Sequence, residues 1–121
     1  MAAVMNAPLY TIEILRLAGS LPDPMHLERV DGAAQLRSPT CGSTVRTEVQ
    51  LDAEGTVAAV SQQVRACAFG QASAALVARD AHGKSREDIA EALAPARSRT
   101  SRHGAILLPF RALLAALESA R

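Results

Sequence analysis

A pattern in residues 45–51, where β-branched or aliphatic side chains alternate with charged or amide ones, constrains the fold most strongly. The inward-facing positions are Val45, Thr47, Val49 and Leu51. A period of two is typical of a strand with one buried face. Residues 52–55 end in a glycine that suits a tight turn, and residues 57–64 predict a return strand. The centre of the chain is therefore expected to be a β-hairpin.

The register of this hairpin brings the two cysteines of the chain together. A hairpin centred on Glu54 pairs Val45 with Gln63. Continuing the ladder outward pairs Cys41 with Cys67, and directly opposed residues have Cβ atoms about 4.5–5.5 Å apart. We therefore predict that both thiols lie within reach of one metal ion. The alternative is that both cysteines are small core residues, since free cysteine is often buried.

The surroundings of each cysteine favour a thiol with a chemical role. Cys41 lies in a turn over residues 38–42, where Gly42 lets the backbone approach a bulky group closely. Cys67 lies at the start of a predicted helix, and a helix N-terminus favours the thiolate that binds metal or attacks sulfur. The two cysteines therefore mark the candidate site of this chain.

Helices are predicted on either side of the hairpin. Helical spacing and capping signals place them at residues 6–19, 68–83, 85–93 and 106–117. Ser85 and Asp88 form a capping box, and Pro109 is expected in the first turn of the last helix. A weak, interrupted strand signal covers 27–36. This order predicts one α+β domain, residues 1–121, with helices on one face of an antiparallel sheet.

Charge and hydropathy exclude several classes of function. The formal net charge is +1, whereas a non-specific nucleic-acid binder carries a strong basic excess. No apolar run approaches the ~18 residues that a membrane span needs, and the N-terminus lacks the features of a signal peptide. We expect a cytoplasmic protein whose thiols stay reduced. A basic cluster is either a solvated loop or a docking surface for an acidic partner; it consists of Arg97, Arg99, Arg102 and His103.

Several short motifs follow one another in a characteristic order. They are Gly32-Ala33, Pro39-Thr40-Cys41-Gly42-Ser43, Cys67-Ala68, Ala72-Ser73-Ala74 and Gly83-Lys84-Ser85, with the hairpin after the second. On these motifs the chain resembles the IscU/NifU-type iron–sulfur cluster scaffold family, from about Tyr10 to the last helix. The resemblance implies a three-stranded antiparallel sheet with helices on one face. It also implies a protein that holds a nascent, transient [2Fe–2S] cluster or iron, receives sulfur from a cysteine desulfurase, and serves apo-acceptor proteins.

The resemblance also implies a set of ligands. The family typically uses three cysteines and one aspartate, sometimes with a histidine just before the third cysteine. Cys41 and Cys67 match the first two cysteines, and His103 matches the histidine. Ser43 stands at the aspartate position and Gly104 at the third cysteine, so the chain is a divergent member of the pattern. The candidate cluster and metal ligands are therefore Cys41, Cys67 and His103.

This ligand set is incomplete for a cluster. An iron–sulfur cluster usually takes four protein ligands, and this set offers three at most. Either a second subunit of a homodimer or a small thiol would supply the missing one. Two cysteines and one histidine also suit Zn²⁺ with an open fourth position, and a third outcome is that no metal binds stably. His26 and His82 are expected to be solvated.

Three functions follow from these features. The leading hypothesis is an iron–sulfur cluster assembly scaffold, which is not an enzyme. The second is a degenerate paralogue of the scaffold that acts as a non-catalytic interaction or zinc-binding module, favoured by Ser43 and Gly104. The third, an enzyme with a nucleophilic cysteine, would need a positioned base. His103 is the only candidate for that base near the site, and no carboxylate can be placed to orient it.

Overall fold

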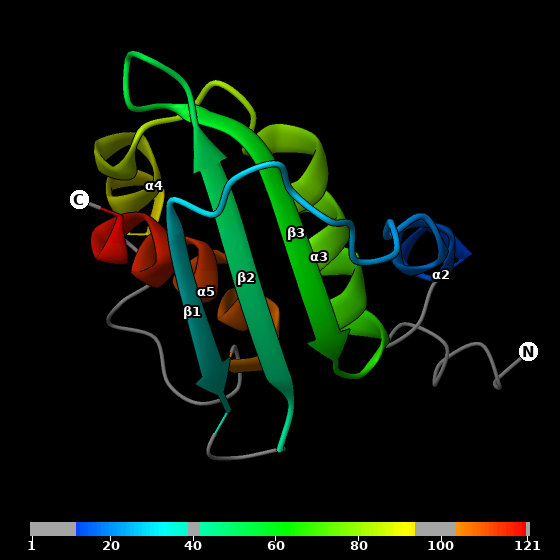
Figure 1. Cartoon of the computed structure of the whole chain (residues 1–121). Helices are drawn as coiled ribbons and strands as arrows, with labels where there is room; N and C mark the ends of the chain where they lie inside the picture. Colours follow the sequence, from blue (N-terminus) through cyan, green and yellow to red (C-terminus); the bar gives the residue numbers. More distant parts are fainter. Residues whose placement is uncertain (1–11, 39–41, 94–103, 121) are drawn as a thin grey trace, which may run out of the picture.

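The three strands form one antiparallel sheet in the order β1-β2-β3, with helices packed behind it (Figure 1). This computed structural model describes residues 12–38, 42–93 and 104–120. In chain order its elements are α2 (Ile12–Gly19), β1 (Gly32–Arg37), β2 (Thr44–Leu51), β3 (Val57–Arg65), α3 (Ala68–Asp80), α4 (Arg86–Leu93) and α5 (Gly104–Ser119). Helices α3, α4 and α5 lie on one face of the sheet, and α2 packs beside α3. The predicted α+β class and three-stranded antiparallel sheet are confirmed.

The central hairpin forms as predicted, but most of its register is displaced by one residue. Leu51 pairs with Val57, and a bulge beside Leu51 then shifts the rest of the ladder. Val45 consequently faces Val64 instead of Gln63, so that predicted pairing was wrong. The bulge places its extra residue on β3 and leaves the alternation of β2 undisturbed, which is why the pattern of β2 does not reveal it.

Alternation along β2 sorts its side chains between the two faces of the sheet. Val45, Thr47 and Val49 are fully buried on the face that the helices cover. The side chains packed with these valines include Leu113 and Ala112 of α5. Each valine or leucine buried in this way contributes about 1.5–3 kcal/mol. An aliphatic seam between β2 and α5 therefore holds the domain together.

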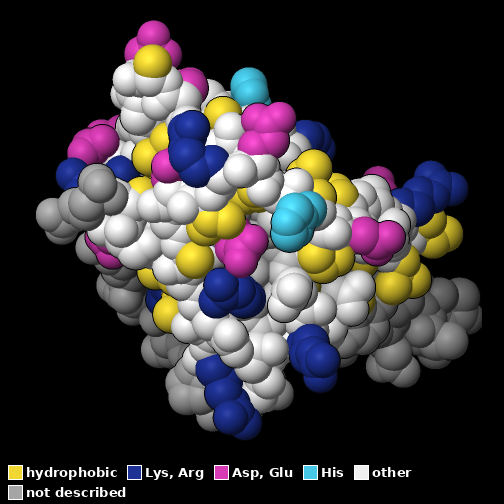
Figure 2. All heavy atoms as spheres, in the orientation of Figure 1, with side chains coloured by type: hydrophobic (Ala, Val, Ile, Leu, Met, Phe, Trp, Pro, Cys, Tyr) yellow, Lys and Arg dark blue, Asp and Glu magenta, His cyan; other side chains and the backbone are white. Residues whose placement is uncertain are grey.

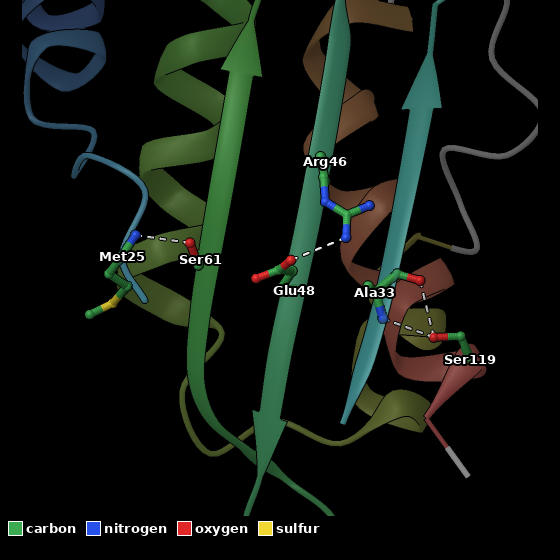
Figure 3. Close-up of polar contacts among 6 residues, drawn as sticks. All are labelled: Met25, Ala33, Arg46, Glu48, Ser61 and Ser119. Carbon is green, nitrogen blue, oxygen red and sulfur yellow. Dashed lines mark hydrogen bonds and ion pairs between the residues drawn. The ribbon is translucent and has the colours of Figure 1, made fainter. Parts of the chain in front are cut away.

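The opposite face of the sheet, here called the outer face, is polar and is crossed by the segment between α2 and β1 (Figure 1). The Met25 N–H donates to Ser61 Oγ on β3 at 2.9 Å, which ties this segment to the sheet (Figure 3). Along β2, Arg46 Nη2 and Glu48 Oε2 form an ion pair at 3.1 Å. The outer face therefore carries charged and hydroxyl groups where the inner face carries aliphatic ones.

Helix and strand limits test the predicted caps. Ser85 Oγ accepts from the Asp88 N–H at 3.1 Å and Asp88 Oδ2 accepts from the Ser85 N–H at 3.0 Å, so the capping box is confirmed. Pro109 lies in the second turn of α5 and not in the first, because the helix extends further toward its N-terminus than the apolar spacing indicates. The strand predicted over 27–36 starts only at Gly32, since the residues before it cross the outer face.

Two predicted features extend beyond the described residues. The helix predicted over 6–19 is seen from Ile12 onward, as α2, and its earlier part lies outside the described chain. The basic cluster at Arg97, Arg99, Arg102 and His103 also lies outside it. Among the residues that the structure describes, none of the helices has the length and apolar character needed to cross a bilayer.

The free edge of β1 is capped by the end of α5. Ser119 Oγ accepts from the Ala33 N–H at 3.0 Å (Figure 3). Its hydroxyl lies 3.1 Å from the Ala33 carbonyl and 2.9 Å from the Ala116 carbonyl, to either of which it can donate. Unpaired groups on an edge strand invite pairing with other chains. The contact therefore protects the edge and fixes α5 to β1.

The turn of the hairpin depends on one carboxylate. Asp52 Oδ2 accepts from the Thr56 hydroxyl at 2.6 Å, and Asp52 Oδ1 accepts from the backbone N–H groups of Thr56 and Glu54, each at 3.0 Å. The hydroxyl of Thr56 and then these backbone groups lower the pKa of Asp52 below its ordinary value. A carboxyl whose pKa is lowered by folding stabilises the folded state above its unfolded pKa, and this contribution disappears as the pH falls through its folded pKa.

We therefore expect Asp52→Ala to lower the free energy of unfolding at about pH 7, and the difference from the parent protein to shrink as the pH falls below about 4. Urea denaturation at a series of pH values measures it. Glu54→Ala, in the same turn, is the control and should have little effect at any pH. A difference for Asp52→Ala that stays constant down to about pH 2 would contradict the role given to its charge.

Candidate functional site

One end of the sheet brings together the chain segments that flank the predicted ligands. The strand register pairs Arg37, the last residue of β1, with Thr44, the first of β2. Thr44 also pairs with Arg65, the last residue of β3. The end of β1, the start of β2 and the end of β3 therefore lie side by side (Figure 1). We call this end of the sheet the site end.

Cys67 lies at the site end, two residues beyond β3, and is the N-cap of α3. Its backbone is extended, with φ −69° and ψ 176°, and its carbonyl accepts from the Gln71 N–H at 2.9 Å. The side chain makes no capping hydrogen bond, and the first turn of α3 contains no acidic residue. Cys67 is exposed, so the alternative that it fills the core is wrong. Its predicted position at the start of a helix is confirmed.

The β1–β2 connection is anchored on both sides of Cys41. The Ser38 N–H donates to the Ser43 carbonyl at 2.8 Å, and the Gly42 N–H donates to the Ser38 carbonyl at 3.1 Å. Gly42 has a φ of +75°, which favours glycine over any residue with a Cβ. Ser38 and Ser43 are both buried. The loop that carries Cys41 therefore leaves the sheet from two fixed points at the site end.

Helix α5 starts at the same end of the sheet. Leu108 and Ala112, in the first half of the helix, form a buried cluster with Val45 of β2. Leu36 and Val64, which lie next to the site end on β1 and β3, pack against this cluster. Gly104 begins α5, one helical turn before Leu108. The residue that precedes α5 in the chain is His103.

Among the three predicted ligands, the described residues include Cys67 alone. Cys41 and His103 lie outside them, so the proximity of the three side chains stays a prediction. The ladder ends at the pair of Thr44 and Arg65, and Cys67 lies beyond it as the N-cap of α3. The predicted pairing of Cys67 with Cys41 across the ladder is therefore wrong. Within residues 12–38, 42–93 and 104–120, no three histidine, cysteine or acidic side chains gather closely enough to hold a metal ion.

The charge at the site end is positive. Arg37 and Arg65 flank Thr44 there. Carboxyl groups with a lowered pKa lie away from the site end. One example is Asp31, beside the far end of β2, whose pKa is lowered by the Arg29 guanidinium and by the Leu51 N–H. Neither arginine was predicted as a functional residue from the sequence. The two arginines lie in one row only because β1 and β3 both pair with β2. The one feature of the sequence that could have indicated this is that each arginine is the last residue of its strand.

Comparisons with known proteins give structural likeness without a match by sequence. No family model and no curated protein matches the chain. The N-terminal part of a nitrogen-fixing NifU-like protein from Brucella abortus is similar, with 27% identity, a TM-score of 0.81, and coverage of 95% of this chain and 96% of that one. A putative iron–sulfur cluster assembly scaffold protein for the SUF system from Fervidobacterium islandicum AW-1 has 18% identity, a TM-score of 0.72, and coverage of 92% and 98%. A protein described as hypothetical has 24% identity, a TM-score of 0.65, and coverage of 93% and 98%.

Proposed function

Taking the chain as a structural member of the IscU/NifU-type scaffold family, we propose that it holds a transient iron–sulfur cluster and passes it to acceptor proteins. The main support is the convergence at the site end. The described residues beside the three predicted ligands belong to segments far apart in the sequence, and they meet at one end of one sheet. An exposed cysteine at a helix N-terminus is suited to bind iron or to accept sulfur.

The ligands in this proposal are Cys41, Cys67 and His103. Ser43 is buried and its hydroxyl is a poor ligand, and Gly104 offers no side chain. The fourth position would be filled by a small thiol or by a second subunit. A cluster held by three protein ligands is released more easily than one held by four, which suits a carrier. A cysteine desulfurase would supply the sulfur, and we place the protein in the cytoplasm with its acceptors.

Anaerobic reconstitution with ferric iron and sulfide tests the proposal. The parent protein should give cluster absorption bands with matched amounts of iron and sulfide. Cys67→Ser and Cys41→Ser should each lose most of the bands, because either change leaves at most two of the proposed ligands. His103→Ala should weaken them.

His82→Ala is the matched control, since His82 is exposed in the turn after α3 and should leave the bands unchanged. Circular dichroism of each variant establishes that the fold is intact. Cluster binding is ruled out if the parent protein gives no bands, and the ligand assignment is wrong if Cys67→Ser retains them.

A second candidate function is favoured by Ser43 and Gly104, which stand where the family pattern has two further ligands. In that case the chain is a scaffold paralogue that binds zinc or only a protein partner. Metal analysis of protein purified without oxygen distinguishes the two functions. Iron with sulfide supports the scaffold, whereas zinc or no metal supports the paralogue.

A further inference from the structure

The outer face of the sheet carries two rows of long polar side chains at the site end. The first row is Arg37, Thr44 and Arg65, one residue from each strand. The second row, two residues further along each strand, is Gln35, Arg46 and Gln63. Residues two apart on a strand point to the same face, so three arginines share one surface. We call these six residues the arginine face.

The arginine face lines a shallow groove. The groove has a volume of about 510 Å³ and is lined by the six residues of the arginine face together with Gly42. Figure 2 shows this side of the molecule, with dark blue Lys and Arg side chains along its lower half and no Asp or Glu side chain between them. The groove therefore borders the loop that carries Cys41.

The positive charge of the groove is left largely uncompensated. Arg46 pairs with Glu48, in the next row of the outer face. Neither Arg37 nor Arg65 forms an ion pair with any residue in the described part of the chain. The segments outside the described part, 1–11, 39–41, 94–103 and 121, contain no Asp or Glu. The guanidinium groups of Arg37 and Arg65 are therefore available to carboxylates of another molecule.

We propose that the arginine face is a docking surface for an extended acidic segment of a partner protein. The backbones of Arg37 and Arg65 lie two strand spacings apart, about 10 Å, so each guanidinium group can bind a carboxylate of its own. In an extended segment, side chains at alternate positions point the same way about 7 Å apart, so that several carboxylates can meet the three guanidinium groups. Each guanidinium can bind a carboxylate through two hydrogen bonds.

The other classes of occupant fit less well. A small anion prefers an enclosed pocket that buries most of its surface, whereas this groove is open along the sheet. A single-stranded nucleic acid is usually held by aromatic side chains that stack on its bases, and the six residues of the arginine face include none. Apart from Gly42, the groove is lined by polar and charged residues, which suits a hydrophobic partner poorly. Charge complementarity therefore selects an acidic protein segment.

This inference goes beyond the proposed function, because it requires neither Cys67 nor a bound metal. A partner on the arginine face would reach the β1–β2 connection on one side and the end of β3, two residues before Cys67, on the other. A partner that delivers or receives a group at the site end would therefore be oriented by this surface. The surface can be tested with or without a cluster.

The test uses a peptide of alternating glutamate and threonine, seven residues long, with the same peptide made with glutamine as the uncharged control. Two-dimensional NMR of the isotope-labelled full chain at low salt follows the titration. We expect the acidic peptide to shift the amide signals of the arginine face, and its affinity to fall as salt is raised to about 0.15 M. Arg37→Gln combined with Arg65→Gln should weaken binding at least about tenfold.

The matched control is Arg79→Gln combined with Arg86→Gln, which removes the same charge from α3 and α4. It should change the affinity less than about twofold. Equal loss in both double variants, or equal binding of the glutamine peptide, overturns the proposal. The proposal is also overturned if citrate or a single-stranded oligonucleotide binds the arginine face as tightly as the acidic peptide does. It is overturned as well if concentrating the protein alone causes the same shifts of the amide signals. Dispersed NMR spectra show that each variant is folded.

Discussion

Gly32→Ala should destabilise the protein by about 3 kcal/mol or more, because no space exists for a methyl group between β1 and α5. A Cβ built on Gly32 would lie 2.0 Å from the carbonyl oxygen of Ala116 and 2.8 Å from the Cβ of Ala120. The first of these atoms belongs to the backbone of α5, so it cannot move aside as the tip of a side chain can. Helix and strand would have to separate.

The effect of this separation would spread beyond the contact itself. The hydrogen bonds between Ser119 and Ala33 lie one residue along β1 and would be lost with it. Ala116 and Leu113, on the same helix, are fully buried in the core. A domain of this size is stable by about 5–15 kcal/mol in total, so this change removes a large part of the margin. The melting temperature should fall by roughly 10 °C or more.

Gly19→Ala is the control for this prediction. Gly19 is the last residue of α2, and a Cβ built on it meets no atom within 4 Å. Because alanine favours a helix over glycine by about 0.5–1 kcal/mol, this variant should be as stable as the parent protein or slightly more stable. Urea denaturation compares the two. If both variants unfold at the parent midpoint, the close approach of β1 and α5 is wrong.

Local patterns predicted the elements of the fold better than their pairing. The alternation of β2 and the capping box of Ser85 and Asp88 depend on neighbouring residues, and both are confirmed. The bulge beside Leu51 and the position of Pro109 were missed. A bulge changes which residues of β3 face β2, and that choice is made by packing across the sheet. No short window of sequence contains it.

In the candidate site, too, local features were predicted from the sequence and long-range ones were not. The place of Cys67 at the start of a helix follows from the residues around it, and the structure confirms it. The row of Arg37, Thr44 and Arg65 joins three strands, so it exists only once both registers are known. The close approach of Gly32 to α5 is also a long-range property. Motif and period therefore identify candidate ligands, and the tertiary structure adds the surface beside them.

Gly104→Cys should slow the loss of a reconstituted cluster by at least about tenfold, which corresponds to about 1.4 kcal/mol of added bonding. Gly104 is the first residue of α5, at the site end, and helical backbone accepts residues that have a Cβ. The resemblance puts the third cysteine of the family at this position. A thiolate there would complete four ligands with Cys41, Cys67 and His103.

The rate at which a chelator removes iron from the reconstituted protein measures this effect. Ala53→Cys is the matched control: Ala53 is exposed in the turn of the hairpin, at the end of the sheet away from Cys67. It adds a third cysteine without placing it near the site, so it should leave the rate unchanged. Equal slowing by both variants would mean that an added thiol slows the loss of iron without being a ligand at the site end. No slowing by Gly104→Cys would mean that α5 does not begin beside the cluster, and the ligand set would have to be sought elsewhere.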